Sequence, residues 1–387
     1  MDFELTQEQA ALRQTVRDFA QREIATGATE RDEFCRFPHE LIPKMAELGL
    51  FGIMVPESYG GAALDALSLA VIIEEIAAVD AAVALMVASH NSLSAGHIGG
   101  FGSEGQKRKF LVPLARGEKL AAWALTEPEA GSDAQSLVSR AMLNGNTWVL
   151  NGEKAFITQG STAGVYVIMA ATEPSRGREG ISAFIVERER TGLEVVRVEN
   201  KLGVRASDTA QIRLDNVQIP KENLLGELNC GYRDAMTILD GGRIGIGAMA
   251  VGIARAALKQ SIAYAKQRRQ FGKPIAAFEA IQWKLADMAT EIDAARLLVY
   301  HAADLRQRGQ PYRRLASEAK LFASEVAMRA TKEAIQVHGG AGYMKSSPVE
   351  RYFRDAKICE IGEGTSEVQR MVIARQLLRR TDVTAGK

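Results

Sequence analysis

The chain has 387 residues, and its 48 Lys and Arg residues against 47 Asp and Glu residues give a formal net charge of +1. This near-balance excludes the basic surplus that a nucleic-acid-binding protein needs, and only 6% of the residues are aromatic, which argues against a stacking platform for single strands. Hydrophobic residues make up 47% and charged residues 25%, so bulk disorder is excluded as well. We expect two or three domains from this length.

The three cysteines, Cys35, Cys230 and Cys359, lie far apart and provide no zinc-ligand spacing. We therefore expect a reducing compartment and no metal. The N-terminal residues lack the basic start and apolar core of a signal peptide, and no apolar run reaches the roughly 18 residues of a membrane span. The sequence thus predicts a soluble, cytoplasmic protein without membrane insertion.

The first third of the chain, residues 1–119, is expected to form a helical domain. Thr6 is placed to cap a first helix, and a second helical stretch follows Pro38. Residues 56–64 form a Gly-rich loop. Residues 65–79 and 81–88 are rich in Ala and apolar nearly all round, which predicts helices buried between other helices.

Residues 120–231 change to short β-branched or alternating runs, and we expect strands over 147–150, 154–158, 165–170, 181–186, 193–198 and 210–214. Asn151-Gly152 separates the first two runs, which predicts a hairpin there. Strands that follow one another without helices indicate an antiparallel barrel or sandwich, not a parallel sheet.

Residues 232–387 are expected to be helical again. Apolar residues at alternating spacings of four and three predict one face of a long helix: Ile281, Leu285, Met288, Ile292, Ala295, Val299 and Ala302. Pro311 suits the first turn of the next helix, and Gly339-Gly340 suits its end. A left-handed antiparallel four-helix bundle with short connections follows.

Residues 245–250 match the pattern G-x-G-x-x-A of dinucleotide-binding proteins. That fingerprint requires a strand before it and a βαβ unit around it, whereas both flanks here have a helical pattern. We interpret these small residues as a place where helices approach closely.

Two other stretches carry side chains that suit ligand binding or catalysis. The first, residues 125–133 with residues 156–158 downstream, offers hydroxyls and exposed backbone for an anionic or polar ring ligand, although an ordinary capped turn would have the same residues. In the second, residues 361–370, Ser366 and Gln369 form a capping-box pattern. Glu363 then lies in a Gly-flanked loop before a helix N-terminus, either as a reactive carboxylate or as a partner of the helix dipole.

Taken together, these stretches resemble the acyl-CoA dehydrogenase family, of the short-chain or branched-chain type, over nearly the whole chain from Leu5 to Leu378. The motifs occur in the family's order: Leu125-Thr126-Glu127-Pro128 with Gly131-Ser132-Asp133, Asn151-Gly152-Glu153-Lys154 with Phe156-Ile157-Thr158, Arg268 to Gly272, Gln336 to Gly340, Arg354 to Lys357, and Glu363 to Glu367. The resemblance implies an α+β fold with an N-terminal α-helical domain, a middle antiparallel β-barrel or sandwich and a C-terminal four-helix bundle. It also implies a homotetramer, a dimer of dimers, with one FAD per subunit.

The resemblance assigns roles to individual residues, with Glu363 at the position of the catalytic base. Residues that match those holding the flavin within one subunit are Leu125, Thr126, Gly131, Ser132, Phe156 and Thr158. Residues that match contacts to the FAD of a neighbouring subunit are Arg268, Gln270, Phe271, Gln336, Gly339 and Gly340. Thr365 and Glu367 match a further flavin contact. The substrate-binding positions are Ser132, Asp240, Arg243, Gly362 and Gly364, of which Asp240 and Arg243 match the residues that bind CoA.

The implied reaction is the α,β-dehydrogenation of an acyl-CoA thioester to the trans-2-enoyl-CoA. Glu363 removes the α-proton, the β-hydrogen leaves as hydride to flavin N5, and the electrons pass to an electron-transfer flavoprotein. Hydrogen bonds from a flavin hydroxyl and the Glu363 N–H polarise the thioester carbonyl. We expect the helix N-terminus to lower the pKa of Glu363, and burial under the acyl chain to raise it toward neutrality.

Several departures from the family pattern bear on the substrate. Gly362 stands where many members have Tyr, as in the isovaleryl-type branch, whose base stands at the position of Gly242. Because Gly242 has no side chain, Glu363 is expected to keep that role. Ala84 replaces the Arg of glutaryl-CoA enzymes, which disfavours a dicarboxylate. Phe156 replaces the usual Trp beside the flavin.

Gln270 and Glu279 differ from the medium-chain pattern, which affects only details of the cross-subunit contacts. The favoured substrate is a short or branched, uncharged acyl-CoA, and a cyclic acyl group is an alternative. An acyl-CoA oxidase, a flavin monooxygenase and a helical scaffold without FAD remain as competing interpretations.

Overall fold

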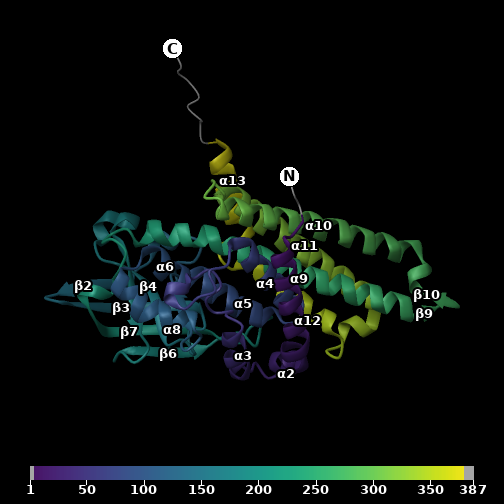
Figure 1. Cartoon of the computed structure of the whole chain (residues 1–387), viewed down its shortest axis with the longest axis horizontal. Helices are drawn as coiled ribbons and strands as arrows, with labels where there is room; N and C mark the ends of the chain where they lie inside the picture. Colours follow the sequence, from purple (N-terminus) through teal and green to yellow (C-terminus); the bar gives the residue numbers. More distant parts are fainter. Residues whose placement is uncertain (1–3, 379–387) are drawn as a thin grey trace, which may run out of the picture.

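The computed structural model describes residues 4–378, and it places helices at both ends of the chain and a sheet between them. Figure 1 shows an elongated molecule with the sheet at one end. Long C-terminal helices run to the opposite end, where the short strands β9 (Arg269–Gln270) and β10 (Lys273–Pro274) lie.

The N-terminal helices begin as the sequence predicts, because a capping box forms at Thr6: its hydroxyl accepts from the Gln9 N–H at 3.2 Å, and the Gln9 side chain accepts from the Thr6 N–H at 3.1 Å. The helices of this part are α1 (Gln7–Phe19), α2 (Ala28–Glu33), α3 (Ile42–Glu47), α4 (Ala66–Ala77), α5 (Ala81–Ser89), α6 (Gly96–Phe101), α7 (Glu104–Gln106) and α8 (Val112–Ala115). A π-helical segment, η5 (His90–Ala95), joins α5 to α6. The expectation of buried helices over 65–79 and 81–88 is confirmed by α4 and α5.

The central sheet has the strand order β6-β7-β3-β2-β4-β5-β8, and β1 pairs with β4. Its strands are β1 (Ala121–Ala124), β2 (Arg140–Asn144), β3 (Thr147–Thr158), β4 (Val165–Ala171), β5 (Ile181–Glu187), β6 (Leu193–Val198), β7 (Thr209–Pro220) and β8 (Leu224–Leu225). Most pairs are antiparallel, as the sequence predicts, but β4 runs parallel to β1 and meets β2 in parallel at one residue pair.

The hairpin predicted at Asn151-Gly152 is wrong. Strand β3 runs straight through both residues, and the chain turns earlier, at Gly145 and Asn146, so that Asn144 pairs with Thr147. Gly152 has a φ of +147°, and its register with β7 shifts, so Asn-Gly here marks a bulge. A Cβ at Gly152 would lie 2.2 Å from the Ser139 hydroxyl, which gives a second reason for glycine.

The C-terminal part consists of α9 (Gly231–Gln267), α10 (Glu279–Gln307), α11 (Arg313–His338), α12 (Pro348–Ile361) and α13 (Ser366–Leu378). The predicted apolar face of α10 is confirmed, with five members buried and Ile281 and Leu285 half-buried. Gly339 ends α11 with a φ of +60°, as expected. Pro311 lies before the first turn rather than in it, because α11 begins at Arg313.

Helix α9 passes through the middle of the molecule and packs against α4, α5, α10, α11 and α12. Residues 245–250 lie inside it, so their small side chains serve close helix packing, as predicted. Within the described residues α9 is the one helix long and apolar enough to cross a membrane, but 83% of its apolar window is buried inside the protein. A hydrophobic cluster from α4 and α5 through α9, α10 and α11 joins the two helical parts into one core.

Candidate active site

Glu363 lies in the loop between α12 and α13, with a φ of +55° and Gly362 and Gly364 on either side. Side chains from elsewhere fix the backbone of this loop. The Lys320 Nζ donates to the Gly364 carbonyl at 2.7 Å, and the Gln369 Nε2 donates to the same oxygen at 2.8 Å. The Glu363 carboxylate itself has no hydrogen-bond partner in the described part of the chain, although its Oε2 is buried.

The predicted capping box at Ser366 and Gln369 is displaced by one residue. The Thr365 hydroxyl accepts from the Val368 N–H at 3.3 Å and so caps α13, whereas Ser366 is already the first helical residue. The Ser366 hydroxyl is buried without a partner among the described residues. Glu367 is exposed in the first turn of α13, close to Thr365 in the chain.

The carboxylate of Glu363 occupies the space that a side chain at Gly242 would fill. A Cβ at Gly242 would lie 2.0 Å from Glu363 Oε2 and 3.1 Å from Leu93 Cδ2. Burial raises the pKa of Glu363 to about 7, while the positive charges of Lys320 and Arg243 oppose the rise. The site therefore holds a carboxyl group that takes up and releases a proton near neutral pH.

Lys320 is a site residue that the sequence analysis missed. It is fully buried on α11, and burial lowers its pKa to about 8. Its partner, the Gly364 carbonyl, lies 44 positions along the chain, so no local pattern signals the contact. The lysine fixes the loop and places a positive charge near the Glu363 carboxylate.

Asp240 and Arg243 lie together on α9, one turn from each other. The Arg243 Nη1 donates to Asp240 Oδ1 at 2.5 Å and to the Ser317 hydroxyl at 3.3 Å, and the Arg313 Nε donates to Asp240 Oδ2 at 2.5 Å. Two guanidinium groups thus share one carboxylate and leave a net positive charge. Arg313 thus joins Asp240 and Arg243 in this cluster, although the sequence had indicated only the latter two.

The residues predicted to hold a polar ring ligand meet at the start of the sheet. The Ala155 N–H donates to the Thr126 carbonyl at 2.9 Å, so Thr126 lies against the strand that carries Phe156 and Thr158. Phe156 has a φ of +58°, and its ring is 64% exposed. Leu125 belongs to the same buried cluster as Leu93, which links this region to the Glu363 site.

A buried ion pair fixes the segment around Thr126. The Lys154 Nζ donates to Glu127 Oε1 at 2.6 Å and to the Leu125 carbonyl at 3.2 Å. Glu127 also accepts from the backbone N–H groups of Val138 and Ser139. Burial disfavours the charged carboxyl, but the Lys154 charge and these hydrogen bonds outweigh it and lower the pKa of Glu127. Burial lowers the pKa of Lys154 to about 8, so the pair stays ionic at neutral pH.

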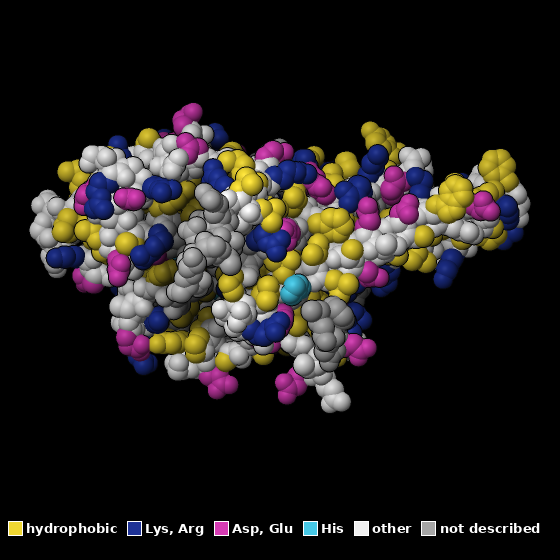
Figure 2. Space-filling view, turned by 90° about the horizontal axis from the view of Figure 1, so that it is seen from above, with side chains coloured by type: hydrophobic (Ala, Val, Ile, Leu, Met, Phe, Trp, Pro, Cys, Tyr) yellow, Lys and Arg dark blue, Asp and Glu magenta, His cyan; other side chains and the backbone are white. Residues whose placement is uncertain are grey.

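Another group of predicted residues gathers at the opposite end of the molecule. Arg268 ends α9, Gln270 and Phe271 lie in the β9–β10 hairpin, and Phe271 is 91% exposed. His338 stacks on Tyr264 at 4.3 Å and joins the end of α11 to that of α9; Gln336, Gly339 and Gly340 lie at this same end. Figures 1 and 2 show this end as a narrow extension with hydrophobic side chains on its surface, far from the sheet. Within one chain this group does not meet Thr126 and Phe156.

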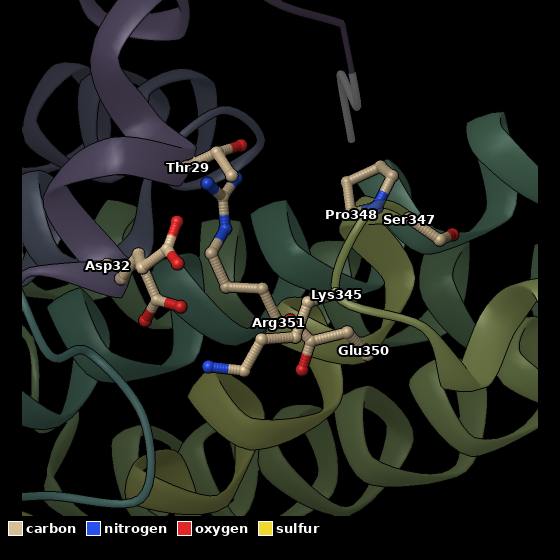
Figure 3. A pocket seen from close by; sticks show the side chains of 8 residues that line it. Thr29, Asp32, Lys345, Ser347, Pro348, Glu350 and Arg351 are labelled. Atoms are coloured by element: carbon tan, nitrogen blue, oxygen red, sulfur yellow. The ribbon is translucent and has the colours of Figure 1, made fainter.

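The Arg354-Asp355 motif joins parts of the fold and does not belong to the Glu363 site. Arg354 pairs with Asp32 at 2.6 Å and with Glu350 at 2.7 Å, and Asp355 accepts from the Val204 N–H at 2.6 Å. Figure 3 shows the small polar pocket at this junction of α2 with α12, where the side chains of Asp32, Glu350 and Arg351 lie. The motif joins the N-terminal helices, the sheet region and α12.

Comparison with known proteins gives consistent matches over the described chain. The N-terminal, middle and C-terminal domain models of acyl-CoA dehydrogenase match residues 6–118, 122–217 and 229–378. A short-chain specific acyl-CoA dehydrogenase of Clostridium acetobutylicum is 48% identical, over 98% of this chain and 100% of its own length.

Two solved structures have the same fold. Butyryl-CoA dehydrogenase of Megasphaera elsdenii superposes with a TM-score of 0.96 at 47% identity, over 98% of this chain and all of that one. A chain from a structure described as the electron transferring flavoprotein of Acidaminococcus fermentans gives a TM-score of 0.97 at 46% identity, with the same coverage.

The buried pair of Lys154 and Glu127 predicts a large loss of stability when one partner is removed. Lys154→Met leaves the Glu127 charge unpaired in the interior, so we expect the free energy of unfolding in urea to fall by about 3–5 kcal/mol. Lys109→Met, which removes the lysine of an exposed pair with Glu187, should cost less than about 1 kcal/mol. The double change Lys154→Met with Glu127→Leu should recover much of the loss. Equal, small effects of Lys154→Met and Lys109→Met would contradict a structural role for the buried pair.

Proposed function

Because the chain belongs to the acyl-CoA dehydrogenase family, we propose that it oxidises the Cα–Cβ bond of a short-chain or branched acyl-CoA to the trans-2-enoyl-CoA, with FAD as its cofactor and Glu363 as its base. The observation that carries this proposal is the Glu363 carboxyl: its Oε2 is buried, it has no hydrogen-bond partner among the described residues, and burial raises its pKa to about 7. A general base works best with a pKa near the operating pH.

The chain offers a group to polarise the thioester carbonyl. The Glu363 N–H donates to no backbone carbonyl in the described part of the chain, and the extended ψ of 148° at Gly362 turns that N–H away from the last turn of α12. We assign it to the thioester oxygen, where it stabilises the negative charge that develops as the α-proton leaves. Glu363 receives that proton and holds it as a neutral carboxylic acid.

The residues near Thr126 fit a flavin. An exposed aromatic ring at Phe156, the hydroxyls of Thr126 and Thr158, and open space at Gly131 provide a surface for a flat polar ring. Leu125, Ser132, Thr365 and Glu367 complete the proposed contacts. When bound, FAD supplies the acceptor for the hydride that leaves the β-carbon.

The position of the second group of residues supports a shared site. Arg268, Gln270, Phe271, Gln336, Gly339 and Gly340 are exposed at the end of the molecule away from Phe156, so they are free to reach the FAD of a neighbouring subunit. A closed homotetramer, a dimer of dimers, satisfies every such site.

The substrate assignment rests on charge and on space beside Glu363. Asp240 and Arg243 are proposed to hold the CoA portion, with Ser132, Gly362 and Gly364 along the thioester. A Cβ at Gly362 would approach only Ile358, at 3.4 Å or more, so the backbone does not require glycine there. The missing side chain leaves room for a branched acyl group, and the same room suits a cyclic one. The acceptor of the electrons is proposed to be an electron-transfer flavoprotein.

Glu363→Gln tests the base directly. It should lower kcat by about 10²–10⁴ and leave the FAD content unchanged, because the amide cannot take the α-proton. The matched control is Glu360→Gln, which removes a carboxylate three residues away that pairs with Lys357. Flavin bleaching under anaerobic conditions with butyryl-, isovaleryl- and cyclohexanoyl-CoA measures both the variant effect and the acyl preference. Near-normal bleaching by Glu363→Gln would refute the assignment, and rapid reoxidation by O₂ in place of the flavoprotein would favour an oxidase.

The charge of Lys320 predicts how kcat/KM depends on pH. Since Glu363 must be deprotonated to act, kcat/KM should rise with pH through a midpoint of about 7. Lys320→Met removes a positive charge that favours the carboxylate, so the midpoint should move to higher pH. Lys332→Met, on the exposed face of the same helix, should leave the midpoint unchanged. A midpoint that stays in place or falls in Lys320→Met would contradict the proposed coupling.

A flavin site shared between subunits predicts the mass of the assembly, and it predicts that FAD is lost when a cross-subunit contact is removed. Sedimentation should give about four times the 42.0 kDa of one chain. Phe271→Ser should release FAD without loss of helical circular dichroism, whereas Phe34→Ser, at another exposed phenylalanine, should retain it. A monomer that binds FAD fully would refute the cross-subunit contacts.

A further inference from the structure

Gln369 is a buried residue to which the proposed function gives no role. The sequence pattern pairs it with Ser366 as a helix cap, but Thr365 caps α13 instead. Its side chain is fully buried and turns back to the loop before the helix, where Nε2 donates to the Gly364 carbonyl at 2.8 Å and to the Glu363 carbonyl at 3.4 Å. The amide therefore binds the loop that carries the proposed base.

The backbone of this loop has a conformation that needs support. Glu363 and Gly364 follow each other with φ values of +55° and +97°, and a residue other than glycine is strained in this left-handed region. Such a conformation persists where the surrounding structure determines it. The Gly364 carbonyl has two lone pairs and receives two donors, the Gln369 amide and the Lys320 Nζ at 2.7 Å. These donors hold the peptide units that follow Glu363.

The loop and the Gln369 amide fit closely together. A Cβ at Gly364 would lie 2.8 Å from the Gln369 Nε2, so the amide reaches the loop only because position 364 has no side chain. Without the amide, the residue at 363 is free to return to a negative φ. Its carboxylate would then leave the place beside Gly242 that it occupies here.

The other polar atom of the same amide speaks against a purely stabilising role. Gln369 Oε1 is buried without a hydrogen-bond partner among the described residues. An unsatisfied buried acceptor lowers stability, and an apolar side chain of similar length, such as methionine, would avoid that loss. Stability alone thus does not explain glutamine at this position, whereas the two hydrogen bonds that it donates to the loop do.

We propose that Gln369 is a positioning residue that holds Glu363 in the conformation needed to remove the α-proton. This inference rests on the proposed function, in which Glu363 is the base. Lys320 binds the same carbonyl but also carries a charge, whereas the neutral amide of Gln369 acts through geometry alone. Loss of the amide should therefore slow proton removal while CoA binding at Asp240 and Arg243 continues.

Gln369→Met tests this role in the FAD-loaded enzyme, because it keeps the length of the side chain and removes both donated hydrogen bonds. Flavin bleaching is followed anaerobically after rapid mixing with butyryl-CoA at a series of concentrations. We expect the rate at saturation to fall by about 10–100-fold, since a small displacement of a catalytic group is enough for such a loss. The half-saturating concentration, the FAD content and the urea midpoint should stay unchanged. Gln376→Met, the same change at a half-buried glutamine of the same helix, should bleach like the parent enzyme.

Gln369→Glu provides a second test through the pH dependence. This variant keeps the size of the side chain, but the introduced carboxyl group donates a hydrogen bond only in its protonated form. The bleaching rate of the parent enzyme should rise with pH to a plateau. The rate of Gln369→Glu should fall again at alkaline pH, as the introduced group ionises.

Parent-like bleaching rates and pH profiles in Gln369→Met and Gln369→Glu would overturn the proposal. A parallel loss of FAD, urea stability and rate in both variants would also overturn it, because that pattern indicates a structural role only. If Glu363→Gln is inactive while both variants at position 369 bleach normally, this inference alone fails. If no acyl-CoA bleaches the parent enzyme, the proposed function fails.

Discussion

Close packing against α9 is the constraint on which the rest of the molecule depends. A Cβ at Gly252 would meet the Glu74 carbonyl at 2.4 Å, and one at Gly247 would meet Val299 at 2.9 Å, so α4 and α10 can approach only a helix without side chains there. Glycine in a helix costs about 0.5–1 kcal/mol per residue relative to alanine. Burial against the surrounding helices offsets that cost. The same constraint at Gly242 admits the Glu363 carboxylate, so the core and the site share one helix face.

The buried charges divide according to whether they have hydrogen-bonded partners. Lys154 and Glu127 satisfy each other and the backbone around them, and Lys320 is tied to the Gly364 carbonyl. Burying a charge is tolerable when it is paired and hydrogen-bonded in this way. The Glu363 carboxyl has no such hydrogen bond among the described residues, and its pKa rises toward neutrality as a result. The positive charges of Lys320 and Arg243 limit the rise of this pKa, but neither residue forms a hydrogen bond with the carboxyl.

Sequence patterns predict those parts of the molecule that local spacing determines. The face of α10 and the glycine end of α11 follow from helical periodicity and a positive φ. The hairpin at Asn151-Gly152 fails because the same dipeptide suits a bulge, and only the partner strand decides between them. The sequence does not predict the role of Lys320, because the carbonyl that its Nζ binds lies in a loop 44 residues away in the chain. Likewise, no spacing along the chain reveals that Arg268 and Thr126 lie at opposite ends.

The contact between Gly242 and Glu363 means that the helix and the loop compete for the same space. Two segments distant in the chain converge on one small volume, which holds a single carboxylate. A side chain added at position 242 would displace the Glu363 carboxylate, since its Cβ would lie 2.0 Å from Oε2. Any residue larger than glycine at position 242 therefore requires the Glu363 side chain to move.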